Sequence, residues 1–328
     1  MLPIAVDAMG GDDAPGPVLE GAHAAAAEGI PIVLVGPADL GGRTSESGLR
    51  LGLIEASEVI GMHDDPAAGV RRKKDSTLVR AAEAVRDGHA SAMISAGNTG
   101  ATMASALLRM GRIKGVKRPA IATPVPVPGS TPTVLLDAGA NAEVQAEWLV
   151  QFAQMGSIYA RTRFDIAAPK VGLLSIGEEP TKGDDLRKET HDLLATAVGI
   201  DFIGNVEGRD LMTDEVDVVV TDGFTGNVVL KTLEGALKTV MAALLAAFTS
   251  EEEYKSHAEA LMPALLPLAE QMSPDTYGGA VLLGVDGVCI ISHGSSGATA
   301  MQNGIKVARD MVEHDVVAEI ARAIRPEG

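Results

Sequence analysis

The sequence predicts an α/β fold: a doubly wound, mostly parallel sheet in a Rossmann-like three-layer sandwich, from which a helical hairpin projects. Short apolar, often β-branched runs alternate with helical patterns along most of the chain, which is typical of β–α units. Many of these runs end in polar, Gly-rich turns, where such sheets present their binding loops. Residues 228–273 interrupt the alternation with two long helical patterns. We therefore expect residues 1–328 to form a single domain that carries this hairpin.

Composition narrows the class of protein. The chain is 46 % hydrophobic but only 3 % aromatic, and its formal net charge is −17. The charge argues against a nucleic acid partner, and few aromatic side chains are available for stacking bases. Any contact with an anionic membrane would have to be local and apolar. The single cysteine, Cys289, fits a reducing compartment. No signal-peptide pattern or membrane-spanning apolar run is visible, so we expect a cytoplasmic protein.

The first strand, predicted at residues 4–7, runs through a Gly/Asp/Pro turn into an Ala-rich helix over residues 18–28. The glycine spacing of this turn differs from the dinucleotide fingerprint. The second strand, at residues 32–35, ends in Gly36-Pro37 instead of an acidic residue. We therefore expect no nicotinamide cofactor.

The later elements follow the same rhythm. A strand is predicted to end at residues 58–60, a long polar loop to cover residues 62–75, and Ser76 to cap a helix over residues 77–87. Further strands are predicted at residues 92–94, 133–136, 170–174, 201–203, 218–220 and 289–291, with helices at residues 99–110, 144–159 and after the loop 175–183.

Three loops share one pattern: hydroxyl residue, any residue, Gly, any residue, hydroxyl residue, Gly. They are residues 95–100, 221–226 and 292–297, each placed between a strand and a helix. Such loops direct free backbone N–H groups and a positive helix end at one point, which suits an anion such as phosphate. With other polar residues at strand ends, the expected anion-binding set is Asp7, Gly10, Gly11, Ser95, Asn98, Thr99, Asn141, Asn205, Asp222, Gly223, Thr225, Gly226, His293, Ser295 and Ser296.

The hairpin is predicted as one helix over residues 228–248, a charged turn at residues 249–253 and a second helix over residues 254–272. Pro263 and Pro267 should kink the second helix. Its apolar residues are expected at a distorted tip that contacts a membrane, or else in a helix pair that joins two subunits. These tip residues are Leu261, Met262, Leu265 and Leu266.

Several segments resemble the bacterial phosphate acyltransferases, the PlsX type of fatty acid/phospholipid synthesis protein. The matching stretches are residues 7–12, 71–76, 95–100, 111–115, 139–141, 204–207, 221–227, 277–280 and 293–296, in order along nearly the whole chain. One position departs from the family pattern, because Asp13 stands where the family usually has His.

The resemblance implies transfer of a fatty acyl group from acyl-(acyl carrier protein) to inorganic phosphate. The product, acyl-phosphate, would serve phospholipid synthesis through a downstream glycerol-3-phosphate acyltransferase. The resemblance also implies a homodimer, no metal, no organic cofactor, and peripheral association with the cell membrane through the hairpin. It places Lys182 and Asn227 closest to the chemistry.

The residues are compatible with this chemistry. Phosphate is already an anionic nucleophile, so a Ser or Cys nucleophile is not required. Lys182 could supply compensating charge, and the Asn227 amide could donate to the carbonyl oxygen of the thioester. The alternatives are a solvated loop lysine and an asparagine that caps its own helix. His293 could protonate the leaving thiol or be a structural histidine. Asp7, Asp137 and Asp222 are interpreted as acceptors that organise loops, without a metal site.

The basic run Arg71, Arg72, Lys73 and Lys74 stands out in an acidic chain. It could dock an acidic carrier protein, helped by later basic residues, or be a solvated loop. Two other functions stay open: a phosphotransacylase that acts on acyl-coenzyme A, and a non-catalytic protein that binds an anion. The additional basic residues are Arg112, Lys114, Lys117 and Arg118.

Overall fold

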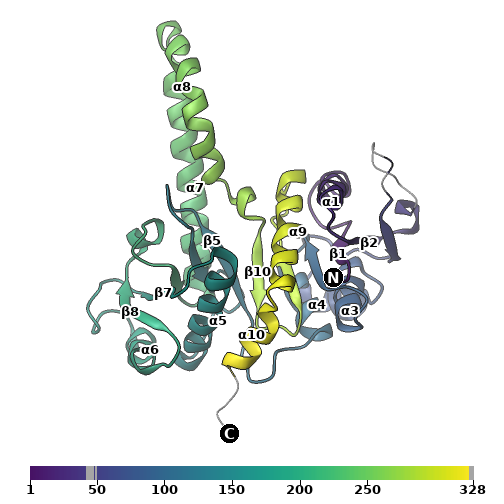
Figure 1. Ribbon diagram of the computed structural model, residues 1–328, viewed down its shortest axis with the longest axis horizontal. Helices are drawn as coiled ribbons and strands as arrows, with labels where there is room; N and C mark the ends of the chain where they lie inside the picture. Colours follow the sequence, from purple (N-terminus) through teal and green to yellow (C-terminus); the bar gives the residue numbers. More distant parts are fainter. Residues whose placement is uncertain (42–47, 49, 325–328) are drawn as a thin grey trace.

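The computed structural model describes residues 1–41, 48 and 50–324. Its strands form one eleven-stranded sheet in the order β3-β2-β1-β4-β11-β10-β5-β6-β9-β7-β8 (Figure 1). The strands are β1 (Ile4–Asp7), β2 (Ile32–Gly36), β3 (Gly52–Glu55), β4 (Ala92–Ser95), β5 (Ala120–Val125), β6 (Thr133–Leu136), β7 (Lys170–Leu174), β8 (Asp201–Val206), β9 (Val218–Val220), β10 (Ala280–Leu283) and β11 (Val288–Ile291).

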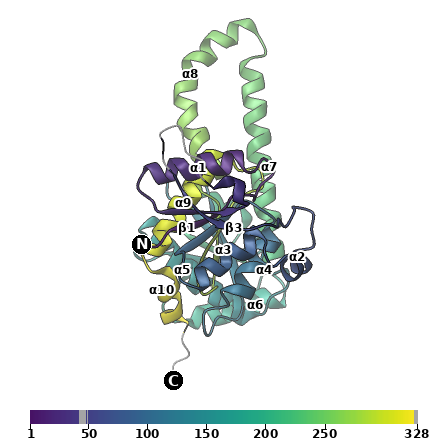
Figure 2. The same ribbon diagram turned by 90° about the vertical axis from the view of Figure 1, so that its right-hand side faces the viewer.

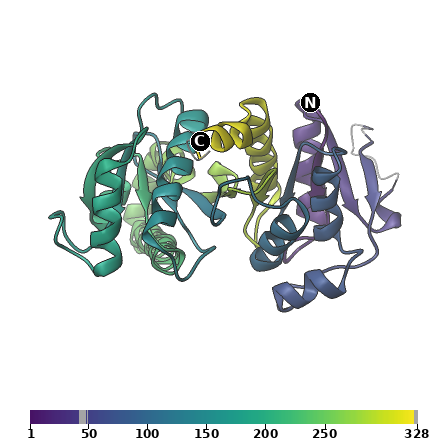
Figure 3. The same ribbon diagram turned by 90° about the horizontal axis from the view of Figure 1, so that it is seen from below.

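The helices cover both faces of this sheet, which confirms the predicted three-layer α/β class. Ile4 and Val6 of β1 belong to one core cluster and Ala5 to another, because successive strand residues point to opposite faces. The helices are α1 (Gly16–Ala27), α2 (Pro66–Arg72), α3 (Thr77–Arg86), α4 (Thr99–Arg109), α5 (Ala146–Phe164), α6 (Asp185–Thr196), α7 (Gly223–Phe248), α8 (Glu252–Gln271), α9 (Ala298–Glu313) and α10 (Val316–Ala323). Figure 3 shows α9 and α10 between the two halves of the molecule.

Seven of the ten strand pairings are parallel, in agreement with a mostly parallel sheet. The other three, which join β11, β10, β5 and β6 in succession, are antiparallel. Three reversals make the block β6-β9-β7-β8 run opposite to the block β3-β2-β1-β4-β11. The strands of the two blocks therefore point in opposite directions, and the loops that follow their carboxyl ends leave from opposite ends of the strands. A doubly wound, mostly parallel sheet, as predicted from the sequence, would instead have these loops together at one end.

Some local predictions were wrong. The expected polar loop at residues 62–75 contains helix α2, which begins at Pro66 after Asp65 caps it by accepting from the Ala68 N–H at 2.7 Å. The predicted strand end at residues 58–60 forms only an isolated bridge from Glu58 to Ser76, because the strand of this region is β3. Ser76 does precede α3, but its hydroxyl makes no capping hydrogen bond.

The helical hairpin of α7 and α8 projects from the body of the molecule (Figures 1 and 2). Helix α7 starts at Gly223, within the glycine loop, earlier than predicted. The turn between the helices is at residues 249–251 and leads into Glu252 and Glu253. The polar, acidic turn agrees with the charged turn predicted there, whereas residues 261–266, which were expected at an apolar tip, lie near the middle of α8 and away from the turn. No helix in the described part of the chain is long and apolar enough to cross a membrane.

Candidate active site

The loops after β1, β4 and β11 form the first half of the candidate site. The Ser95 hydroxyl donates to Asp7 Oδ2 at 2.7 Å, and the Asp12 N–H donates to the Gly294 carbonyl at 2.8 Å. Gly10 lies against this pair, since a Cβ there would be 2.6 Å from Ser95 Oγ. Burial raises the pKa of Asp7, although hydrogen bonds from Ser95 and Thr77 oppose the shift. The buried Asp7 carboxyl thus holds this half together.

Asn98 anchors the neighbouring segment. Its Oδ1 accepts from the Ala101 N–H at 3.0 Å and caps α4, while Nδ2 donates to the Met62 carbonyl at 2.9 Å and to Asp64 O at 3.2 Å. Thr99 follows it as an exposed residue at the start of α4. The Asn98 amide is therefore engaged in holding α2 and the residues before it beside α4.

The loop after β6 forms part of the second half and is organised by Asp137. Its carboxylate accepts from the N–H groups of Ile121, Gly139, Ala140 and Asn141, and from Asn141 Nδ2 at 2.9 Å. Burial raises the pKa of Asp137 against these hydrogen bonds. The loop supports the start of α7, where the Gly223 N–H donates to Asn141 O at 2.7 Å.

Gly226 allows α7 to approach this loop. A Cβ at Gly226 would lie 1.9 Å from the Asp137 carbonyl oxygen, so no larger residue fits without moving the backbone. The same close approach places the next residue, Asn227, beside Gly139: a Cβ on Gly139 would be 3.7 Å from the Asn227 side chain.

Asp222 caps α7 and pairs with Arg187, which the sequence did not single out. Asp222 accepts from the Thr225 N–H and hydroxyl, each at 2.8 Å, and also from Arg187 Nη2. Burial alone would raise its pKa, but the hydrogen bonds from Thr225 and the charge of Arg187 hold the pKa of Asp222 below its ordinary value. Arg187 also reaches Thr225 Oγ1 at 3.2 Å.

This arrangement predicts a pH-dependent stability. Because the folded-state pKa of Asp222 lies below 3.8, its carboxylate stabilises the fold above that pH, and the contribution is lost as pH falls through the folded-state pKa. Asp222→Asn should cost about 1–3 kcal/mol of unfolding free energy near pH 7. Urea unfolding at several pH values measures this.

The matched control for that prediction is Asp185→Asn, at a fully exposed carboxylate on α6. It should leave stability nearly unchanged. Asp222→Asn should lower the free energy of unfolding less at a pH below the ordinary pKa of the carboxyl than at pH 7. An equal loss at both pH values would show that the charge of Asp222 is not what stabilises the fold.

Lys182 lies on the loop between β7 and α6. The Lys182 N–H donates to Glu179 O at 3.0 Å, and Asn205 Nδ2 donates to the same oxygen at 2.9 Å. Asn205 therefore fixes this loop. Because α6 follows directly and its Arg187 is bonded to Asp222, the Lys182 loop is tied to the start of α7.

The first turns of α7 connect the two halves. Asn227 and Lys231 are separated by four residues and so lie on the same side of the helix, about one turn apart. Lys231 Nζ is 3.4 Å from His293 Nε2, and His293 Nδ1 is 2.9 Å from Ser295 Oγ. The strand reversals separate the loops at the sheet edges, but α7 brings Asn227 toward the His293 loop. Sequence reasoning missed Lys231.

The two residues expected closest to the chemistry, Lys182 and Asn227, have free polar groups in their side chains. Within the part of the chain that the structure describes, neither the Lys182 ammonium nor the Asn227 amide forms a hydrogen bond or ion pair. Both side chains are exposed. By contrast, Asn98, Asn141, Asn205 and Asp222 have polar atoms engaged in holding loops. Lys182 and Asn227 are therefore available to a substrate in a way that these four residues are not.

Comparison with known proteins decides the family. A family model described as fatty acid synthesis protein matches residues 2–319. A phosphate acyltransferase from Anaeromyxobacter sp. (strain K) is 47 % identical over 331 residues, covering 99 % of this chain and 91 % of the relative. One from Pelotomaculum thermopropionicum is 48 % identical over 334 residues, covering 98 % and 95 %. This chain belongs to the phosphate acyltransferase family. The resemblance noted from the sequence is thereby confirmed, and the chain is an acyltransferase.

Solved structures with a similar fold are more distant from this phosphate acyltransferase family member. A branched-chain phosphotransacylase from Enterococcus faecalis V583 superposes with a TM-score of 0.62 at 15 % identity, covering 96 % of this chain and 100 % of that one. A phosphotransacetylase from Streptococcus pyogenes gives a TM-score of 0.58 at 17 % identity, covering 98 % and 94 %. At these identities the comparison establishes the α/β fold.

Possible metal ligands and the single cysteine also bear on the chemistry of this family member. No set of His, Cys, Asp and Glu side chains among the described residues is arranged to hold a metal ion. Cys289 is fully buried in β11, and burial raises the pKa of its thiol to about 12. Since the thiolate is the reactive form, Cys289 is unsuited to act as a nucleophile near neutral pH.

Proposed function

We propose that this chain transfers a fatty acyl group from acyl-(acyl carrier protein) to inorganic phosphate, giving acyl-phosphate for phospholipid synthesis. The observation that carries the proposal is the unpartnered Asn227 amide, held beside Gly139 and one turn from the Lys231–His293 contact. Family membership supports the acyl transfer, and the site supplies free donors for an oxyanion without a protein nucleophile.

The step needs a positioned phosphate and a stabilised carbonyl oxygen. A phosphate oxygen attacks the thioester carbon, the carbonyl oxygen becomes an oxyanion, and the thiolate leaves as the carbonyl re-forms. We assign the Asn227 Nδ2–H as donor to the oxyanion, and Lys182 as the cation that compensates the charge of the phosphate and the oxyanion. Both groups are free to do so within the described chain.

The remaining loops suit phosphate. Gly10, Gly11, Ser295 and Ser296 belong to backbone turns around the His293 loop, and Lys231 adds a positive charge there. Lys231 is also paired with Glu234 at 2.8 Å, which fixes its position on α7. A thiolate is a good leaving group, so His293 serves here as a hydrogen-bonding residue instead of a required acid.

The basic run at the end of α2 is our candidate dock for the carrier protein. Arg71, Arg72 and Lys74 are exposed, whereas Lys73 pairs with Asp64 at 2.7 Å. Charge steering of an acidic carrier predicts a rate that falls as salt is raised. Asn98 bonds the segment that precedes α2 and so places the beginning of this helix, at the end away from the basic run, beside the start of α4.

The test of the proposed function is a comparison of acyl donors. With phosphate present, acyl-(acyl carrier protein) should give acyl-phosphate with a higher kcat/KM than acyl-coenzyme A. A clear preference for acyl-coenzyme A would instead favour a phosphotransacylase. Anion binding without any turnover of either thioester would indicate a non-catalytic binding protein.

The hairpin supports a further part of the proposal, a homodimer that contacts the membrane peripherally. Leu261 is 53 % exposed and Leu266 is 58 % exposed on α8, an apolar surface left uncovered within one chain. We expect Leu261→Glu with Leu265→Glu to abolish vesicle binding in a flotation assay, since burying two carboxylates in the lipid boundary is unfavourable, while activity on a water-soluble donor survives.

Ser256→Glu is the control for that double variant, because it adds a charge at an exposed polar position of the same helix. It should bind vesicles as the wild type does. If the double variant instead separates into monomers during sedimentation, the apolar residues form a dimer interface and the membrane assignment fails.

A further inference from the structure

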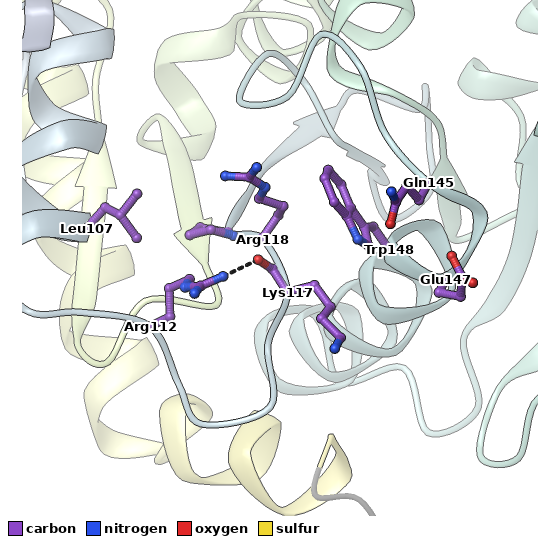
Figure 4. Close-up of a pocket in the computed structure, with 8 residues that line it drawn as sticks. Leu107, Arg112, Lys117, Arg118, Gln145, Glu147 and Trp148 are labelled. Atoms are coloured by element: carbon purple, nitrogen blue, oxygen red, sulfur yellow. Dashed lines mark hydrogen bonds between the residues drawn. The ribbon is translucent and has the colours of Figure 1, made fainter.

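An open cavity of about 770 Å³ lies between the end of α4, the segment 111–119 and the start of α5 (Figure 4). Its size falls within the usual range for small-molecule sites. Arg112, Lys117 and Arg118 contribute cations, Trp148 contributes an aromatic ring, and Leu107 and Pro119 contribute apolar surface. We call this feature the basic cavity.

The charge of the basic cavity contrasts with that of the chain. Its lining has three cations and one carboxylate, Glu147, whereas the whole chain carries −17. The start of α5 adds to this positive character. Gln145 precedes the helix and makes no side-chain capping bond, so the first N–H groups of a nineteen-residue helix lack a cap from that residue. The basic cavity therefore suits an anion.

The cations are held in place. The Arg118 guanidinium carbon lies 4.9 Å from the centre of the Trp148 ring, which is a cation–π distance. Arg112 Nη1 donates to the Lys117 carbonyl, as Figure 4 shows, and this leaves the other guanidinium N–H groups of Arg112 for a ligand. A flat ring beside two positioned guanidinium groups suits an anion with an attached organic chain.

The basic cavity adjoins the candidate active site. Asn141 Nδ2 donates to the carbonyl of Pro119, a lining residue, at 2.8 Å. Asn141 O in turn accepts from the Gly223 N–H at the start of α7, which carries Asn227. A long flexible ligand could therefore have its charged end in the cavity and its reactive end near Asn227.

We propose that the basic cavity binds the phosphate of the phosphopantetheine arm that carries the acyl thioester. The inference rests on the proposed function, which requires a thioester donor. Acyl carrier protein and coenzyme A both present the thiol on this arm, with the phosphate at the end far from the sulfur. Arg112 and Arg118 bind the phosphate, and Leu107 and Pro119 contact the aliphatic part of the arm.

Calorimetry with two small probes tests the proposal without turnover. Phosphopantetheine should bind the wild type about tenfold more tightly than pantetheine, which lacks the phosphate, as expected for a partly exposed charged hydrogen bond. Arg112→Ala and Arg118→Ala should each reduce this difference, and the double variant should remove it. Arg161→Ala, which removes an exposed cation farther along α5, should leave the difference intact.

Equal affinity of the two probes for the wild type would overturn the proposal, as would an equal effect of Arg161→Ala. The same variants are then assayed with both acyl donors. A raised KM for acyl carrier protein and acyl-coenzyme A alike supports a site for the shared arm. A raised KM for acyl-coenzyme A alone would assign the basic cavity to the nucleotide phosphates and overturn the proposal. Failure of the proposed function would appear separately, as binding of the probes without phosphate-dependent turnover.

Discussion

Asn227→Ala should lower kcat/KM for acyl transfer to phosphate roughly 10²- to 10³-fold, or about 3–4 kcal/mol of transition-state stabilisation. The physical reason is the loss of a donor aimed at the developing oxyanion, in a position fixed by the close contact of Gly226 with the Asp137 loop. Most of the loss should appear in kcat, because the interaction strengthens only when the carbonyl oxygen gains charge. Steady-state kinetics with varied thioester and fixed phosphate measures this.

The neighbouring residue provides the control. Val228 is 50 % exposed on the same turn of α7, and Val228→Ala should change kcat/KM little. Asn227→Asp keeps the shape but replaces the donor with an anion, so its activity should be no higher than that of Asn227→Ala. Normal turnover in either Asn227 variant, with unchanged thermal unfolding, would remove Asn227 from the proposed chemistry.

Lys182→Ala should also reduce kcat/KM by roughly 10²-fold or more, because a cation beside the attacking phosphate stabilises negative charge in the transition state. Lys182→Arg should retain part of the activity, since it keeps the charge but changes the donor geometry. The apparent KM for phosphate should rise in Lys182→Ala if the ammonium also holds the ground-state anion.

Lys188→Ala is the matched control for Lys182. It removes one exposed lysine charge from α6, a short distance along the chain, where Lys188 pairs weakly with Asp185 at 3.9 Å. Equal losses in Lys182→Ala and Lys188→Ala would show that general electrostatics, and not a specific contact, accounts for the effect.

The predicted fold class was confirmed because apolar strands and amphipathic helices leave strong periodic signals. What the sequence did not show is the middle of the sheet. Strands β5 and β10 were not predicted: β5 contains Pro124, and β10 is a short apolar run behind Gly278-Gly279. These two strands carry the antiparallel pairings, so missing them also concealed the reversal between the two parallel blocks.

The candidate site was predictable in its composition but not in its connections. The glycine loops and polar strand ends were visible as local motifs, yet only the fold shows which polar groups are engaged. Arg187 is an ordinary helix arginine in the sequence, and its pairing with Asp222 depends on the fold, which brings the first turn of α6 to the start of α7. Lys231 could have been found, because it follows Asn227 by one helical turn; its contact with His293 could not.

The most direct test of phosphate-dependent acyl transfer uses oxygen-18-labelled phosphate with acyl-(acyl carrier protein) and the purified chain. Attack by phosphate on the thioester should give acyl-phosphate that retains the labelled phosphate oxygens, with one thiol released for each acyl-phosphate formed. Mass spectrometry of the product and thiol titration measure both quantities. Two results would contradict transfer to phosphate: release of thiol when phosphate is omitted from the assay, or formation of free fatty acid in place of labelled acyl-phosphate.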